Sequence, residues 1–82
     1  MRLIVLTPEK EIYKGEVKSI QVPGTNGGFE ILNNHAPIVA ALGSGRIRIV
    51  DILGANKSFT IKKGFVEVLK NEVSLLVQGV EE

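Results

Sequence analysis

Turn signals built from glycine, proline and asparagine recur about every ten residues along this chain, leaving room only for short extended segments between them. No window long enough for a helix shows a helical period with capping residues at its ends. This spacing predicts an all-β domain, either a flattened β-sandwich or a barrel. The turn signals are Pro23-Gly24, Gly27-Gly28, Gly43-Ser44-Gly45, Gly54-Ala55-Asn56 and Lys63-Gly64.

Alternation between apolar and polar residues is clearest in "GRIRIVDI". There Ile47 and Ile49 share one side of an extended chain, and Arg46 and Arg48 share the other. The segment "SFTIK" repeats this pattern, with Phe59 and Ile61 on the buried side. Both segments therefore read as strands with one face in water.

The remaining segments predict further strands. Leu3–Leu6 reads as a short strand, closed by Thr7-Pro8. Ile12–Val22 reads as one or two strands, with an interruption at Gly15, because glycine inside a strand pattern often marks a bulge or turn. The segments "FVEVL" and "VSLLV" flank Lys70-Asn71-Glu72, which predicts a hairpin.

Length and composition indicate one ordered domain over residues 1–82. The chain has 82 residues, of which 44% are hydrophobic, which is too apolar for a disordered chain. It contains no cysteine, which fits a reducing compartment. The first apolar run, Leu3–Leu6, is too short for a signal peptide or a membrane span. We therefore expect a soluble chain that meets a membrane only through a partner.

Several functional classes are disfavoured. The net charge is +1, and the basic residues are scattered without aromatic residues between them, so nucleic-acid binding is not expected. The chain has one histidine and no cysteine, which excludes a thiolate nucleophile and a multi-histidine metal site. No serine lies in a nucleophile-elbow sequence, and "GTNGG" lacks the ending of a phosphate-binding loop. We predict no catalytic residue, no metal and no cofactor.

The segment "HAPIVAAL" departs from simple alternation because both of its faces are apolar. In an extended chain Ile38, Ala40 and Leu42 share one face, and Val39 and Ala41 share the other. A domain of this size has one core, so the second face either lies under a loop or awaits a partner. The small alanines favour a partner, because they allow close approach.

Two further side chains have open interpretations. His35 begins this segment, and its ring either bonds to nearby backbone or contributes an apolar body and a polar tip to an interface. Glu67 shares a face with Phe65 and Leu69 in "FVEVL". It is either an exposed carboxylate or one paired with lysine or arginine, within the domain or across an interface.

The stretch "VKSIQVPGTNGGFEILNNHAPIVAALGSGRIRI", followed by "KKGFVEV", resembles the N-terminal β domain of the epsilon subunit of bacterial F-type ATP synthases. Several motifs occur in the family's order and spacing, over almost the whole chain. The chain departs from the family pattern at Glu30, where glycine is usual, at Asn33, where proline is usual, and at Lys63, where glycine is usual. The first two departures bear on local loop geometry.

The resemblance implies a flattened sandwich of about ten short strands. It also implies a non-catalytic rotor subunit that docks on the gamma subunit and on the c-ring, coupling ion translocation to ATP synthesis. The implied location is the cytoplasmic face of the bacterial plasma membrane, with membrane contact only through the complex. Carried over by motif, the expected gamma-facing residues are Thr7, His35, Ala36, Pro37, Ile38 and Ala40. The expected c-ring-facing residues are Thr25, Asn26, Gly27, Gly28 and Glu30.

The family usually continues into a C-terminal helical hairpin, which carries its inhibitory arm and, in some members, an ATP-binding site. Since the given sequence stops at Glu82, we expect a naturally short form whose regulation is missing or different. The residues leave two other functions open. One is a free-standing β-barrel that binds a small ligand in an enclosed pocket, and the other is a small hydrolase that uses His35.

Overall fold

The structure is a computed structural model that describes residues 1–82. It contains eight strands and no helix, which confirms the all-β prediction, although the expectation of about ten strands was too high. The fold offers no helix of sufficient length and hydropathy to cross a membrane. The strands are β1 (Arg2–Leu6), β2 (Glu11–Val22), β3 (Phe29–Leu32), β4 (Ile38–Leu42), β5 (Gly45–Asp51), β6 (Asn56–Ile61), β7 (Lys63–Leu69) and β8 (Glu72–Gln78).

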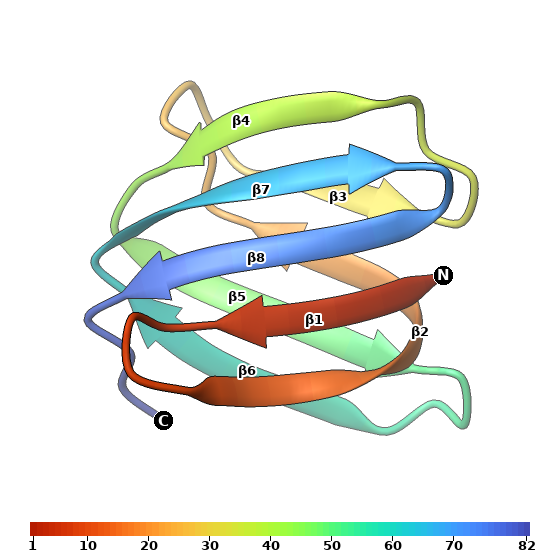
Figure 1. Cartoon of the computed structure of the whole chain (residues 1–82), viewed down its shortest axis with the longest axis horizontal. Helices are drawn as coiled ribbons and strands as arrows, with labels where there is room; N and C mark the ends of the chain where they lie inside the picture. Colours follow the sequence, from red (N-terminus) through yellow and green to blue (C-terminus); the bar gives the residue numbers. More distant parts are fainter.

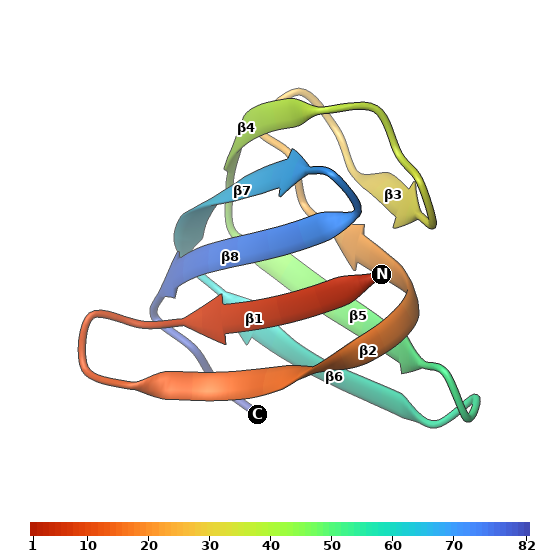
Figure 2. The ribbon, with the colours of Figure 1, turned by 45° about the vertical axis from the view of Figure 1, so that its right-hand side comes forward.

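The strands form one curled sheet in the order β4-β7-β8-β1-β2-β5-β6, with β3 paired to β2. The sheet folds over itself into two layers (Figure 1): β4, β7, β8 and β1 lie in front, and β3, β5 and β6 lie behind. Strand β2 belongs to both layers, since its first half pairs with β1 and its second half pairs with β3 and β5. Figure 2 shows β2 sweeping from one layer to the other.

The bend in β2 is made by a bulge after Val17, where Lys18 is left without a partner on β5. The extra residue lets both Val17 and Ile20 face the core, which strict alternation would forbid. The sequence predicted an interruption at Gly15, but Gly15 pairs regularly with Leu3. The bulge therefore lies three residues further on, where the chain changes layers.

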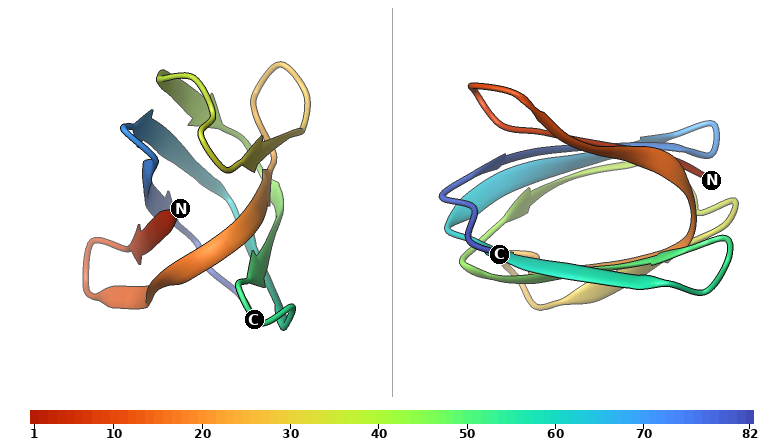
Figure 3. Two further views of the ribbon diagram at one scale, coloured as in Figure 1. Left: turned by 90° about the vertical axis from the view of Figure 1, so that its right-hand side faces the viewer. Right: turned by 90° about the horizontal axis from the view of Figure 1, so that it is seen from below.

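The core lies between the two layers and contains only apolar residues. All seventeen buried residues are hydrophobic, and no buried side-chain polar atom lacks a hydrogen-bond partner. The alternation predicted for β5 and β6 is confirmed, because Ile47, Ile49, Phe59 and Ile61 are all buried. The two layers lie on either side of this interior (Figure 3). Because the seventeen core side chains pack against one another there, the interior does not favour the ligand-binding barrel.

The predicted hairpin between β7 and β8 is confirmed, and its geometry is that of a type I′ turn. Lys70 and Asn71 both have positive φ, 51° and 62°, as this two-residue turn requires. The turn predicted at Lys63-Gly64 is displaced: the chain turns at Lys62, and Gly64 lies inside β7. A Cβ at Gly64 would approach the Leu76 carbonyl oxygen to 2.5 Å, so close backbone packing explains this glycine.

Candidate interaction surfaces

One row of apolar side chains crosses the outer side of the front layer. Ala41 on β4 pairs with Phe65 on β7, Phe65 pairs with Leu76 on β8, and Leu76 pairs with Leu6 on β1. Phe65 and Leu76 are 57% and 52% exposed, although side chains of this size are normally buried. We define the apolar face as the outward side chains Leu6, Val39, Ala41, Phe65, Leu69 and Leu76.

A depression of about 550 Å³ lies over this row. Its walls include Phe65 and Leu76 from the apolar face, together with Thr7 and Pro8 from the turn after β1. Thr7 closes that turn, because its hydroxyl oxygen accepts hydrogen bonds from the backbone N–H of Glu9 and of Lys10. The structure thus places Thr7 at the same depression as Ala41 and Phe65, although both residues are far from Thr7 in the sequence.

The two faces of β4 differ in exposure, which the sequence could not establish. Ile38 and Ala40 are partly buried and pack against the core, and Leu42 is fully buried. Val39, by contrast, is 74% exposed. Alternation within the strand is confirmed, but the outward side chains are Val39 and Ala41. The expectation that the side chains of Ile38 and Ala40 face outward, toward a partner, is therefore corrected, because both face inward.

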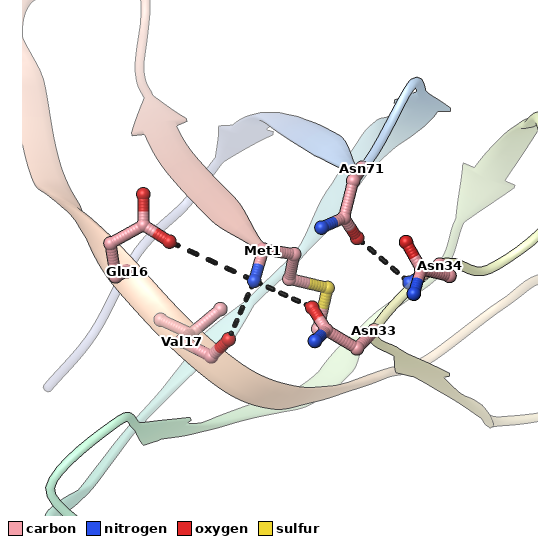
Figure 4. A network of polar contacts seen from close by, with 6 residues as sticks. All are labelled: Met1, Glu16, Val17, Asn33, Asn34 and Asn71. Atoms are coloured by element: carbon pink, nitrogen blue, oxygen red, sulfur yellow. Dashed lines mark hydrogen bonds and ion pairs between the residues drawn. The ribbon is translucent and has the colours of Figure 1, made fainter.

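The loop before β4 is held by asparagine side chains (Figure 4). The Asn71 Oδ1 accepts a hydrogen bond from the Asn34 backbone N–H at 2.7 Å, across the gap between two turns. The Met1 ammonium donates to Asn33 Oδ1 at 2.7 Å and to the Val17 carbonyl oxygen at 3.1 Å. Asn33, one of the departures from the family pattern, is thus a fixed part of the fold here.

His35 follows this anchored turn, and its backbone N–H donates to the Leu32 carbonyl oxygen. The ring Nδ1 lies 2.7 Å from the Ala36 carbonyl oxygen, so Nδ1 is the nitrogen that carries the proton and donates. The ring therefore bonds to nearby backbone, as one of the two sequence interpretations stated. Ala36 and Pro37 are exposed beside it. No hydrogen bond from the His35 ring to a serine is present, which gives no support to the hydrolase alternative.

The residues expected to face a c-ring lie at the other end of β4. Thr25, Asn26, Gly27 and Gly28 form an exposed turn, which is tied to β4 by a hydrogen bond from the Thr25 N–H to the Ala41 carbonyl oxygen. Gly27 has φ 119°, a backbone angle that residues with a side chain rarely adopt, so the turn requires glycine at this position.

Glu30 lies on the outside of β3, beside a second depression of about 600 Å³ that also has Arg46 and Ser44 in its wall. This depression has a smaller share of apolar side chains in its wall than the one over the apolar row. The polar turn thus lies at one end of β4 and His35 at the other, whereas Thr7 lines the depression at the Ala41 end.

Chemical groups for catalysis or metal binding are sparse. No three histidine, aspartate or glutamate side chains gather as a metal site requires. The one clear pKa shift is at Tyr13, whose pKa is raised above 10.0, mainly by burial and further by the nearby Asp51 carboxylate, while Lys57 acts in the opposite direction. Sequence reasoning did not identify Phe65, Leu76 and Val39 as surface residues, because only the register between distant strands brings them together.

The family model and the relatives that match this chain agree on one family. The family model "ATP synthase, Delta/Epsilon chain, beta-sandwich domain" matches residues 1–82. The epsilon chain of ATP synthase from Chlorobium limicola is 42% identical over 96% of this chain and 90% of the relative. The epsilon chain from Leptospira borgpetersenii is 46% identical over 93% of this chain, which spans only 59% of that relative's length.

Solved structures support the same fold. A central-stalk and c-ring structure of the Tetrahymena thermophila mitochondrial ATP synthase contains a chain with a TM-score of 0.82 and 20% identity, covering 100% of this chain and 66% of that one. A mitochondrial ATP synthase structure from Euglena gracilis contains one with a TM-score of 0.89 and 22% identity, covering 96% of this chain and 51% of that one. At these identities the likeness concerns the fold.

Proposed function

We propose that this chain, which belongs to the delta/epsilon-chain family of ATP synthase, is a non-catalytic subunit of the central rotor. In this proposal it docks on the gamma subunit and on the c-ring and helps couple ion translocation to ATP synthesis. Its place is then the cytoplasmic face of a bacterial membrane, which it meets only through the complex.

The observation that carries this proposal is the apolar row Ala41–Phe65–Leu76–Leu6 on the outside of the front layer. Nothing within the chain covers Phe65 or Leu76, although all seventeen core residues are well buried. Contiguous exposed apolar surface of this kind marks protein–protein contacts in soluble proteins. A permanent partner removes this surface from water and gains the corresponding hydrophobic free energy.

We assign the gamma contact to the apolar face and to the segments at its two ends. Thr7 flanks the face at the depression, and His35, Ala36 and Pro37 precede β4 at the other end. Ile38 and Ala40, which the family resemblance also assigned to gamma, contribute from inside by setting the position of β4. Val39 and Ala41 replace them as the contacting side chains of that strand.

We assign the c-ring contact to Thr25, Asn26, Gly27, Gly28 and Glu30. Their turn is exposed and polar, as suits contact with the polar loops of a membrane-embedded ring. Its hydrogen bond to Ala41 connects the turn directly to β4, so a load applied at the turn reaches the proposed gamma-binding layer through the backbone.

The fold suits a mechanical role. Fifty-one backbone hydrogen bonds connect the strands and turns of this small domain, and its core is continuous between the layers. Close-packed interiors of this kind are stiff and transmit strain. A stiff body that touches both gamma and the ring adds contact area to the joint through which torque passes.

The proposal is tested by mixing the purified chain with the gamma subunit of the same organism and measuring binding by calorimetry. We expect a one-to-one complex with a negative heat-capacity change, because apolar surface is buried. Gamma together with the c-ring should retain the chain more tightly than gamma alone. Absence of binding to gamma, with both proteins folded, would contradict the proposal.

A further inference from the structure

Glu67 is a carboxylate in the middle of the apolar face. It lies directly opposite Val39 on β4 and opposite Ser74 on β8. Phe65 and Leu69, two residues before and after it on β7, point to the same side and are both more than half exposed. The charge is therefore surrounded by the surface that the proposed function assigns to gamma.

This carboxylate has no partner in the chain. The two ion pairs of the structure join the Met1 ammonium to Glu16 and Lys57 to Glu82, both away from β7. No side-chain hydrogen bond reaches Glu67 either, and the residue is exposed. In the free chain its charge is satisfied by water alone.

Docking changes that situation. If a partner covers Phe65, Leu69 and Val39, it also removes water from the carboxylate between them. A carboxylate that loses its water without gaining a partner carries a large desolvation penalty, whereas an opposing guanidinium can satisfy both oxygens at once. A partner without a cation here would be rejected.

We propose that Glu67 determines specificity for gamma by pairing with an arginine or lysine that gamma presents to the centre of the apolar face. This inference rests on the proposed function and adds the chemistry of recognition to it. Apolar contacts supply the area, while the single central charge sets the register and excludes partners of the wrong polarity.

A different role would give opposite results. The alternative is that a charge on an apolar sheet face has the sole role of keeping copies of the chain from associating. In that case its removal would leave gamma binding unchanged or make it tighter, and would promote self-association.

The test is calorimetric titration of gamma with the full chain carrying Glu67→Gln, which keeps the side-chain shape and removes the charge. We expect binding about 10- to 100-fold weaker, as for other charge pairs that lose one partner in an interface. The wild-type affinity should also fall more steeply with added salt than that of the variant. Unchanged thermal unfolding of the variant shows that it is folded.

The matched control is Glu72→Gln, which removes the same charge at the start of β8, at the edge of the apolar face, where Glu72 lies between Leu69 on β7 and Arg2 on β1. We expect its affinity to stay within about twofold of wild type, because rim charges contribute little. Wild-type binding with an unaffected or tighter Glu67→Gln variant would overturn this proposal and leave the proposed function standing. No binding by the wild type would overturn both.

Discussion

Two rows of four residues cross the outside of this sandwich, one on each layer, and they differ in chemistry. On the front layer the row reads Ala41, Phe65, Leu76 and Leu6. On the back layer the row across β3, β2, β5 and β6 reads Glu30, Gln21, Arg48 and Ser58. Both rows face away from the core, so folding places the same demand on each.

The back row meets that demand in the ordinary way, with polar side chains in water and apolar ones inside. Nearby, Arg46 donates a hydrogen bond to the Ser58 hydroxyl at 3.0 Å. The front row does not, and its apolar side chains add nothing to the core. The difference supports the proposal that the front row serves a contact outside the chain, whereas folding in water alone accounts for the polar back row.

The largest expected effect tests the inner and outer sides of β4. Ile38→Asp should lower the free energy of unfolding by about 2–3 kcal/mol, because the new carboxylate would be pressed against the core. Val39→Asp, one residue on, should change it by less than about 0.5 kcal/mol, because this side chain is 74% exposed. Urea denaturation followed by circular dichroism measures both. Equal losses would show that the assignment of faces is wrong.

The next effect compares the two rows directly. Phe65→Asp should weaken gamma binding by about 30-fold or more, the range of a central aromatic contact. Ser58→Asp on the back row should leave the affinity nearly unchanged. Both side chains are exposed, so both variants should stay folded. Similar losses from the two variants in calorimetry would remove the distinction between the faces.

A smaller effect concerns the loop at the end of the apolar face. Asn71→Gly keeps the positive φ that the hairpin requires but removes the acceptor for the Asn34 N–H. We expect the Asn34 amide to exchange with solvent about five to ten times faster, which corresponds to about 1 kcal/mol. Asn71→Asp retains an acceptor oxygen and should restore protection. Amide exchange by NMR that is the same in all three chains would contradict this role.

The smallest effect concerns Tyr13, which packs against the core and belongs to neither row. Burial raises its pKa above 10.0, so the folded state holds the phenol proton more tightly than the unfolded state. Its contribution to stability is present below pH 10 and is lost as the pH rises through the raised pKa. Tyr13 is the only tyrosine, so absorbance titration reports it alone. A midpoint at or below 10.0 would contradict the burial.

The sequence predicted those parts of the fold in which local pattern and tertiary position agree. Alternation in β5 and the turn at Lys70-Asn71 are local features, and both predictions are confirmed. The bulge at Lys18 was misplaced to Gly15, because the bend depends on where β2 leaves one layer for the other. Gly64 was read as a turn because a local pattern does not show the close approach of Leu76.

The candidate surface could be predicted only in part. The apolar character of both faces of β4 was visible, but which face is outward depends on pairing with β7. Thr7 and Phe65 line the same depression only because β1 and β7 both pair with β8. The family resemblance named the segments involved, and the register between distant strands decided which of their side chains are exposed.

The central claim is that gamma covers the front row and leaves the back row uncovered. The chain contains no cysteine, so a single Val39→Cys or Ser58→Cys substitution gives one thiol on each face. The most direct measurement is the rate of maleimide labelling of each variant, with and without excess gamma. The account predicts that gamma slows labelling at position 39 at least about tenfold and leaves position 58 unaffected. Equal labelling of position 39 in the free chain and in the complex would contradict it.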